Sequence, residues 1–190
     1  MGILLPIQIV LWLASLTLLA ASAVTDLKER LIPNELVVGV AAIGVTLGLL
    51  ERPGTLWLSL LAAAFAFVAL GFLSHYRMIG GGDLKLLSAV TLLVPPDRIG
   101  QLMIDIALAG GALGCVYVAA HYGLKGLSAT PAGARGLARL DTSDASTIKA
   151  ECTRIAAFGP LPYAVAILGG VLIYATGEFL PCLSARSCSL

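Results

Sequence analysis

The first long apolar stretch of the chain reads ILLPIQIVLWLASLTLLAASAV and runs from Ile3 to Val24. It contains no charged residue, and about 20 apolar residues suffice for a helix to cross the hydrocarbon of a membrane. No basic residue precedes it, and it is longer than the apolar part of a secretory signal peptide. Although Ala21-Ser22-Ala23 resembles a cleavage site, the stretch is predicted to be a retained membrane span.

The remainder of the chain repeats this pattern. Of its 190 residues, 58% are hydrophobic and 12% are charged, whereas soluble domains carry about 25% charged residues. The net charge of +1 gives no reason to expect a nucleic-acid partner. The predicted fold class is all-α: a polytopic membrane protein with a single domain, 1–190, built as a bundle of about six transmembrane helices. The predicted spans lie near residues 3–24, 36–50, 55–74, 84–94, 99–120 and 161–180.

Basic residues predict which loops share a side of the membrane. If all six stretches cross, three loops on one side hold nine of the twelve basic residues. Basic loops favour the cytoplasm, so these loops are predicted to be cytoplasmic and both termini outside. If the short stretch at 84–94 did not cross, the basic loop at 121–158 would move outside and this asymmetry would reverse. The nine residues are Lys28, Arg30, Arg77, Lys85, Lys125, Arg135, Arg139, Lys149 and Arg154.

The cytoplasmic loop at 121–158 begins with residues typical of flexible chain, rich in Gly, Ala, Ser, Thr and Pro. After Asp144, a plausible helix N-cap, the residues Ile148, Cys152 and Ile155 recur at intervals of four and three. This spacing predicts a short amphipathic helix lying on the membrane surface. Two roles are consistent with it: an interfacial anchor, or a gate to the site described next.

Two aspartates stand where a long apolar segment meets a short polar one, Asp26 and Asp83. An acid at the edge of a span is costly to desolvate and therefore marks a candidate functional site. Two predicted spans separate them, so both carboxylates should lie at the same depth on the same side. Two nearby carboxylates can share one proton. One would take a proton from water while the other donates a proton to the scissile group. Asp105, inside the fifth span, has no comparable partner.

A triple glycine, Gly80, Gly81 and Gly82, precedes Asp83. Glycine has no side chain, so this segment is expected to leave room for an extended peptide beside the acid. Asp83 itself is expected near the N-terminus of the fourth helix, where the helix dipole favours a carboxylate.

Other polar residues near the two acids have mainly structural interpretations. Asn34 is expected to cap the second helix, and Pro33 suits the approach to it. Lys28 and Arg30 are expected to fix topology and to meet anionic lipid headgroups, and both are candidates for substrate contact. Lys85, two positions after the second acid, is a candidate for tuning the carboxylate pair or for contacting substrate.

These segments resemble the two signature regions of prepilin peptidases, the bacterial and archaeal intramembrane aspartyl proteases that remove the short basic leader from type IV pilins. The segments are Asp26 with Ile32-Pro33-Asn34, and Gly80-Gly81-Gly82-Asp83-Leu84-Lys85. A third segment, Pro162-Tyr163-Ala164, resembles the Pro-Tyr-Gly start of the last span, with alanine where glycine is usual.

The resemblance implies that the two aspartates are catalytic and that no cofactor is needed. It implies a pilin or pseudopilin precursor as substrate, with one span and a short basic leader, cut after glycine. The cut would be made at the cytoplasmic face of the bacterial inner membrane, with membrane lipid as the surrounding partner.

Large members of that family carry an additional domain with paired C-x-x-C zinc ligands and also methylate the new N-terminus. The four cysteines here are Cys115, Cys152, Cys182 and Cys188, and no C-x-x-C occurs. Zinc is therefore not supported, and neither metal binding nor methylation is expected. The chain resembles the short, peptidase-only members, such as those that serve tight-adherence (Flp-type) pili. Cys182 and Cys188 lie in the tail placed outside, where a disulfide is chemically permitted.

Two other function classes are consistent with a buried pair of acids. Intramembrane proteases of the presenilin or signal-peptide-peptidase kind also use G-x-G-D, but they usually carry Tyr-Asp in the partner span, where this chain has Thr25-Asp26. A small proton- or ion-coupled transporter would more naturally place its acids near the bilayer middle and show repeated halves. The sequence shows no internal repeat.

Overall fold

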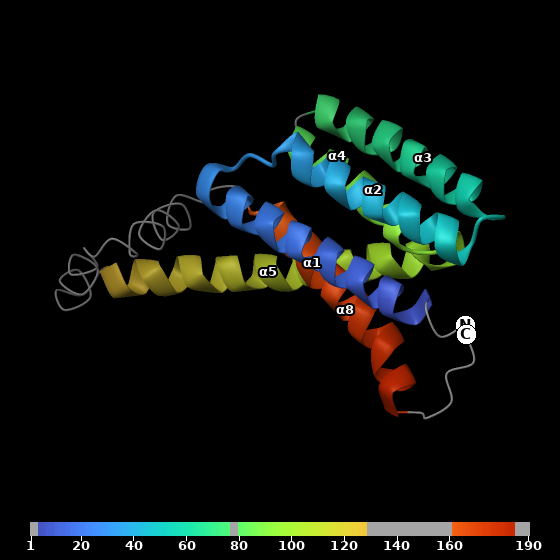
Figure 1. The fold of residues 1–190 in the computed structure, drawn as a ribbon. Coiled ribbons are helices and arrows are strands. Elements are labelled where there is room, and N and C mark those ends of the chain that lie inside the picture. The colour runs from blue at the N-terminus through green and yellow to red at the C-terminus, as the bar shows by residue number, and fades with distance from the viewer. Residues whose placement is uncertain (1–3, 77–79, 129–160, 185–190) are drawn as a thin grey trace.

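The computed structural model describes residues 4–76, 80–128 and 161–184, and all regular structure within them is helical (Figure 1). The predicted all-α fold class is confirmed. The helices are α1 (Leu4–Glu29), α2 (Asn34–Glu51), α3 (Leu56–His75), α4 (Gly81–Val90), α5 (Ile99–Ser128) and α8 (Tyr163–Ser184), with two 3₁₀ turns, η1 (Thr91–Leu93) and η2 (Pro96–Arg98).

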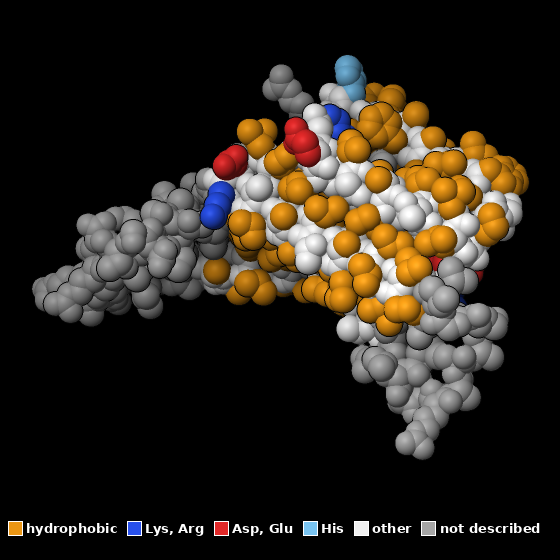
Figure 2. Space-filling model, in the orientation of Figure 1, with side chains coloured by type: hydrophobic (Ala, Val, Ile, Leu, Met, Phe, Trp, Pro, Cys, Tyr) orange, Lys and Arg blue, Asp and Glu red, His pale blue; other side chains and the backbone are white. Residues whose placement is uncertain are grey.

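Three of these helical segments are long and apolar enough to cross a membrane: Pro6–Glu29, Asn34–Glu51 and Pro96–Tyr122. Leu56–Phe72 and Tyr163–Gly177 are shorter apolar helical segments. Figure 2 shows hydrophobic side chains over the middle of one face, with charged side chains toward its edges. This distribution fits a protein surrounded by lipid. The bundle of six spans stays a prediction.

The core joins five helices through large apolar side chains. Leu19, Leu47, Leu86, Leu102 and Ile167, which come from α1, α2, α4, α5 and α8 in that order, are all nearly or fully buried. α1 packs against α2 on one side and α8 on the other, and α4 packs against α2 and α3 (Figure 1). Burial of such side chains fixes the ends of α1, α4 and α8 close to one another.

The most extensive helix contact is between α5 and α8, and it depends on a glycine. A Cβ atom built on Gly170 of α8 would lie 2.6 Å from the backbone nitrogen of Ile106 in α5. Glycine at this position lets the two backbones approach closely, as small residues do where membrane helices pack. The position of α8 relative to α5 therefore depends on the absence of a side chain at Gly170.

The fourth apolar stretch differs from the predicted span at 84–94. Helix α4 begins earlier, at Gly81, and has Asp83 in its first turn, as expected. It ends at Val90 and continues as η1, so the stretch is not one long α-helix. Val94 then takes an extended backbone conformation. The residue before a proline is driven out of the helical region, and Pro95 follows directly.

The turn between α1 and α2 also corrects one expectation. Arg30 has a positive φ of 54° and its backbone N–H donates a hydrogen bond to the Asp26 carbonyl oxygen (3.0 Å), which ends α1. Pro33 occupies the N-cap position and Asn34 is already the first residue of α2. The prediction that the Asn34 side chain caps α2 is wrong. Its side chain is bonded elsewhere, as described below.

Two predictions fall on other parts of the chain. The amphipathic helix predicted after Asp144 and the proposed pairing of Cys182 with Cys188 lie outside the residues and side chains that the structure describes. The start of the predicted loop at 121 is described, and there α5 continues to Ser128.

Candidate active site

The fold brings the two sequence-predicted acids together from separate helices. Asp26 lies in the last turn of α1 and is only 6% exposed, while Asp83 lies in the first turn of α4 and is half-buried. Both helix ends are fixed by the same core. A shared, largely desolvated position is the environment in which two carboxyl groups influence each other's protonation.

The electrostatics of Asp83 reflect this environment. Asp83 precedes the fourth apolar stretch and lies outside the helical segments long enough to span the membrane. Burial raises the pKa of its carboxyl group to about 6, and the nearby Asp26 carboxylate acts in the same direction. The guanidinium of Arg30 lowers the pKa and only partly offsets these two effects. Asp83 can therefore keep its proton at a pH where an ordinary aspartate has lost it.

A backbone donor from the last helix completes the surroundings of Asp26. The N–H of Ala164, in the first turn of α8, donates a hydrogen bond to Oδ2 of Asp26 (3.2 Å). Ala164 is fully buried. A backbone N–H orients a carboxylate and favours its charged form. Sequence reasoning did not identify this contact, because a backbone donor has no residue type; the Pro162-Tyr163-Ala164 motif was the available signal.

The segments beside the two acids contact each other. Lys85 Nζ donates a hydrogen bond to Oδ1 of Asn34 (3.0 Å), which links α4 to the start of α2. A Cβ atom on Gly82 would lie 3.2 Å from Cβ of Ile32. Both contacts hold the α4 N-terminus against the α1–α2 turn, so Asn34 and Lys85 have structural roles here.

The two basic residues after Asp26 differ in their surroundings. Lys28 is exposed, whereas Arg30 is half-buried and close enough to act on the pKa of Asp83. Arg30 therefore belongs to the electrostatic environment of the acids, and Lys28 stays a candidate for lipid or substrate contact.

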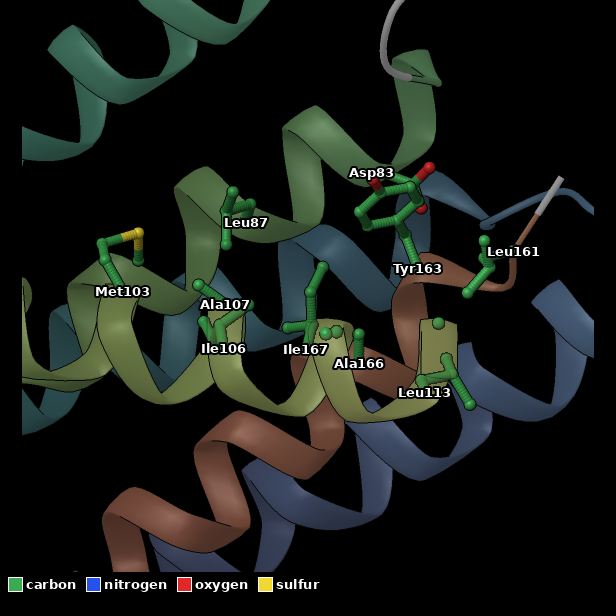
Figure 3. Close-up of a pocket in the computed structure, with 13 residues that line it drawn as sticks. Asp83, Leu87, Met103, Ile106, Ala107, Leu113, Leu161, Tyr163, Ala166 and Ile167 are labelled. Atoms are coloured by element: carbon green, nitrogen blue, oxygen red, sulfur yellow. The ribbon is translucent and has the colours of Figure 1, made fainter. Parts of the chain in front are cut away.

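An apolar cavity of about 500 Å³ adjoins Asp83, between α4, α5 and α8. In Figure 3, Asp83, Tyr163 and Leu161 lie at one end of it and Met103 at the other, with Leu87 between them. Its volume is within the range of about 300–1,000 Å³ that is usual for ligand sites. The carboxyl group of Asp83 thus borders a space that could hold part of another molecule.

The acid within α5, Asp105, has a different hydrogen-bond partner from Asp26 of this site. Asp105 of α5 is buried, and its Oδ1 accepts a hydrogen bond from Nε2 of Gln101 (3.0 Å). Among residues 4–76, 80–128 and 161–184, no group of three or more His, Cys, Asp or Glu side chains is arranged to hold a metal ion.

A family model matches more than half of the chain. The model of the type IV leader peptidase family matches residues 12–124, a range that includes both aspartates and the bond between Lys85 and Asn34 but ends before α8. No curated protein and no solved structure gives a significant match.

Proposed function

The chain belongs to the type IV leader peptidase family, and from this premise we propose that it is an intramembrane aspartic endopeptidase. Its proposed substrate is a pilin or pseudopilin precursor, from which it removes the short basic leader. Family membership supports a peptidase in general. The aspartic mechanism is supported by one observation above all, the meeting of Asp26 and Asp83 at the ends of two helices with their protonation linked.

The proposed reaction needs only these two side chains and a water molecule. The ionised carboxyl group takes a proton from the water, whose oxygen attacks the scissile carbonyl carbon. The protonated carboxyl group donates its proton to the carbonyl oxygen. The other carboxyl group, which now carries the proton from the water, delivers that proton to the leaving amine, and the first carboxyl group takes its proton back from the collapsing intermediate. The peptide C–N bond breaks, and no covalent acyl-enzyme forms. The raised pKa of Asp83 supports a pair that holds one proton between two carboxyl groups.

The position of the pair suits a cut just outside a substrate's own membrane helix. Helical backbone in lipid is protected by its internal hydrogen bonds, whereas a leader that precedes the helix is still extended. The substrate is therefore proposed to have a basic leader that ends in glycine, followed by an apolar helix. This chain is proposed not to methylate the product.

We propose that the protein lies in the bacterial inner membrane, with the acids at the cytoplasmic face and both termini outside. The support is that basic residues concentrate in the predicted loops on the side of the acids. Reporter fusions after Ser128 and after the C-terminus test this orientation. A cytoplasmic signal from the C-terminus would show that the stretch containing α4 does not cross.

The proposed function is tested with membranes that contain this protein and a candidate precursor. We expect a new N-terminus, read by mass spectrometry, directly after the glycine that ends the leader. A cut deep inside the apolar helix would instead indicate a presenilin-like protease. Absence of any cut in pilin-like precursors, with the protein correctly folded, would contradict the proposal.

The triple glycine provides a matched pair of variants. A Cβ atom on Gly80 would lie 2.8 Å from Oδ2 of Asp83, whereas one on Gly81 would meet no atom within 4 Å. Gly80→Ala should therefore displace the carboxyl group and lower the cleavage rate by roughly 10–100-fold, since small misplacements have effects of this size. Gly81→Ala should leave the rate unchanged. The prediction fails if the two variants cleave equally well at equal melting temperature.

The pH dependence of cleavage follows from the pKa of Asp83. Because that pKa is raised to about 6, the pair loses its shared proton as the pH rises through this value, and the rate should fall there. Arg30→Gly removes the charge that lowers this pKa and suits the positive φ at Arg30. The midpoint of the fall should then move to higher pH. Lys28→Gln is the control, and an identical midpoint in all three proteins would contradict the assignment.

A further inference from the structure

We propose that the cavity between α4, α5 and α8 binds the first apolar residues that follow the scissile bond of the substrate. This inference rests on the proposed function and adds to it a binding site for the substrate helix. The cavity borders the carboxyl group of Asp83 at one end (Figure 3). Any chain cut at the pair must continue away from it, and the cavity provides the adjoining space.

The lining of the cavity indicates which side of the cut it receives. Apart from Asp83 and Tyr163, the residues that line it are apolar or glycine. A basic leader would lose its hydration there without gaining a partner for each charge. Apolar side chains carry no charge that needs hydration or a partner, so they can enter apolar surroundings without this loss. The segment after the cut therefore fits the cavity, and the leader remains on the polar side of Asp83.

The wall that α5 contributes has the spacing of a helix-docking surface. Gly110 and Gly114 line the cavity together with Gly111, so that α5 presents a G-x-x-x-G pattern to it. Such patterns let two membrane helices approach closely. Cβ atoms on Gly111 and Gly114 would meet no atom within 4 Å. Packing among the residues that the structure describes therefore does not require these two glycines, although glycine weakens a helix relative to alanine.

A second copy of this chain is the competing occupant of a glycine-rich face. Its helix in the cavity would cover Asp83 and block the access of substrate to the pair. A substrate helix gains the same close contact and brings its scissile bond to Asp83. The shared border with Asp83 therefore favours the substrate.

Contact is tested by photo-crosslinking in full-length protein. Leu113→benzoylphenylalanine, combined with Asp83→Asn to prevent cleavage, should crosslink the precursor within the first residues of its apolar helix. The same probe at Phe65, which lies on α3 and is 74% exposed, should not crosslink it. Crosslinks from Phe65 but not from Leu113, or crosslinks between two copies of this chain, would overturn the proposed binding site.

A kinetic test separates this inference from the proposed function. Gly111→Leu and Gly114→Leu fill the cavity and should raise KM for the precursor at least tenfold. Gly100→Leu is the matched control, since a Cβ atom there also meets nothing within 4 Å and Gly100 does not line the cavity. If the unaltered protein cleaves the precursor and all three variants match it, the binding site is refuted and the peptidase function stands. If the unaltered protein cleaves no precursor, the proposed function itself fails.

Discussion

Replacement of either Asp26 or Asp83 by asparagine is expected to abolish cleavage of the precursor. An amide can neither take a proton from water nor deliver one to the leaving group, and loss of such catalysis costs about 10²–10⁴-fold or more in rate. The exchange is nearly isosteric. In Asp26→Asn the side-chain oxygen can still accept the hydrogen bond from the Ala164 N–H. Expression and melting temperature should therefore stay close to those of the unaltered protein.

The control for these variants is Asp105→Asn. Asp105 is buried as deeply as Asp26, but it bonds to Gln101 and is separate from the pair. This variant should retain cleavage, measured as the rate of appearance of the shortened product. Substantial activity in Asp26→Asn or Asp83→Asn would remove that residue from the catalytic role. Loss of activity in Asp105→Asn at an unchanged melting temperature would show that a third acid takes part.

The second large effect is expected at the contact between α5 and α8. In Gly170→Leu even the first side-chain carbon would overlap the backbone of Ile106, so the helices must move apart. Overpacking of a tight contact typically lowers the free energy of unfolding by about 1–3 kcal/mol and occasionally more. Cleavage should be lost as well, because α8 carries the Ala164 N–H that is bonded to Asp26.

Gly177→Leu is the matched control, on the same helix with no atom within 4 Å of its Cβ position. For both variants, the melting temperature is measured by thermal unfolding in detergent, and the activity is measured as cleavage of the precursor. Gly170→Leu should melt at a clearly lower temperature and Gly177→Leu should not. Equal melting temperatures would mean that the close approach of α5 and α8 does not support the fold.

The sequence predicted the helices and the paired acids because both depend on local signals. Apolar length located α2, α3 and the beginning of α5 to within about two residues. The number of predicted spans between Asp26 and Asp83 led to the expectation that the two acids share one side of the membrane, and the side itself stays a prediction. The resemblance to prepilin peptidases is confirmed by the family match. The catalytic roles and the pilin substrate stay predictions.

The features that the sequence did not predict depend on residues distant along the chain. Asn34 was expected to cap α2 by a local rule, yet its side chain accepts a hydrogen bond from Lys85, 51 positions away. The bond from the Ala164 N–H to Asp26 spans 138 positions and uses a backbone group. The end of α4 at Val90 was also missed, since apolar composition does not distinguish an α-helix from the 3₁₀ turn that follows it.

The shortness of α4 has a consequence for biogenesis. Its ten residues and the three of η1 rise by about 21 Å in total, less than the hydrocarbon thickness of about 30 Å. Such a segment is a poor candidate for insertion by itself, and here it is stabilised by burial of Leu86, Val90 and Leu93 against its neighbours. Asp83 therefore reaches Asp26 only after those neighbours are in the membrane. We therefore expect no cleavage by a partly synthesised chain in which those neighbours are not yet in place, so that membrane proteins being made beside it would be spared.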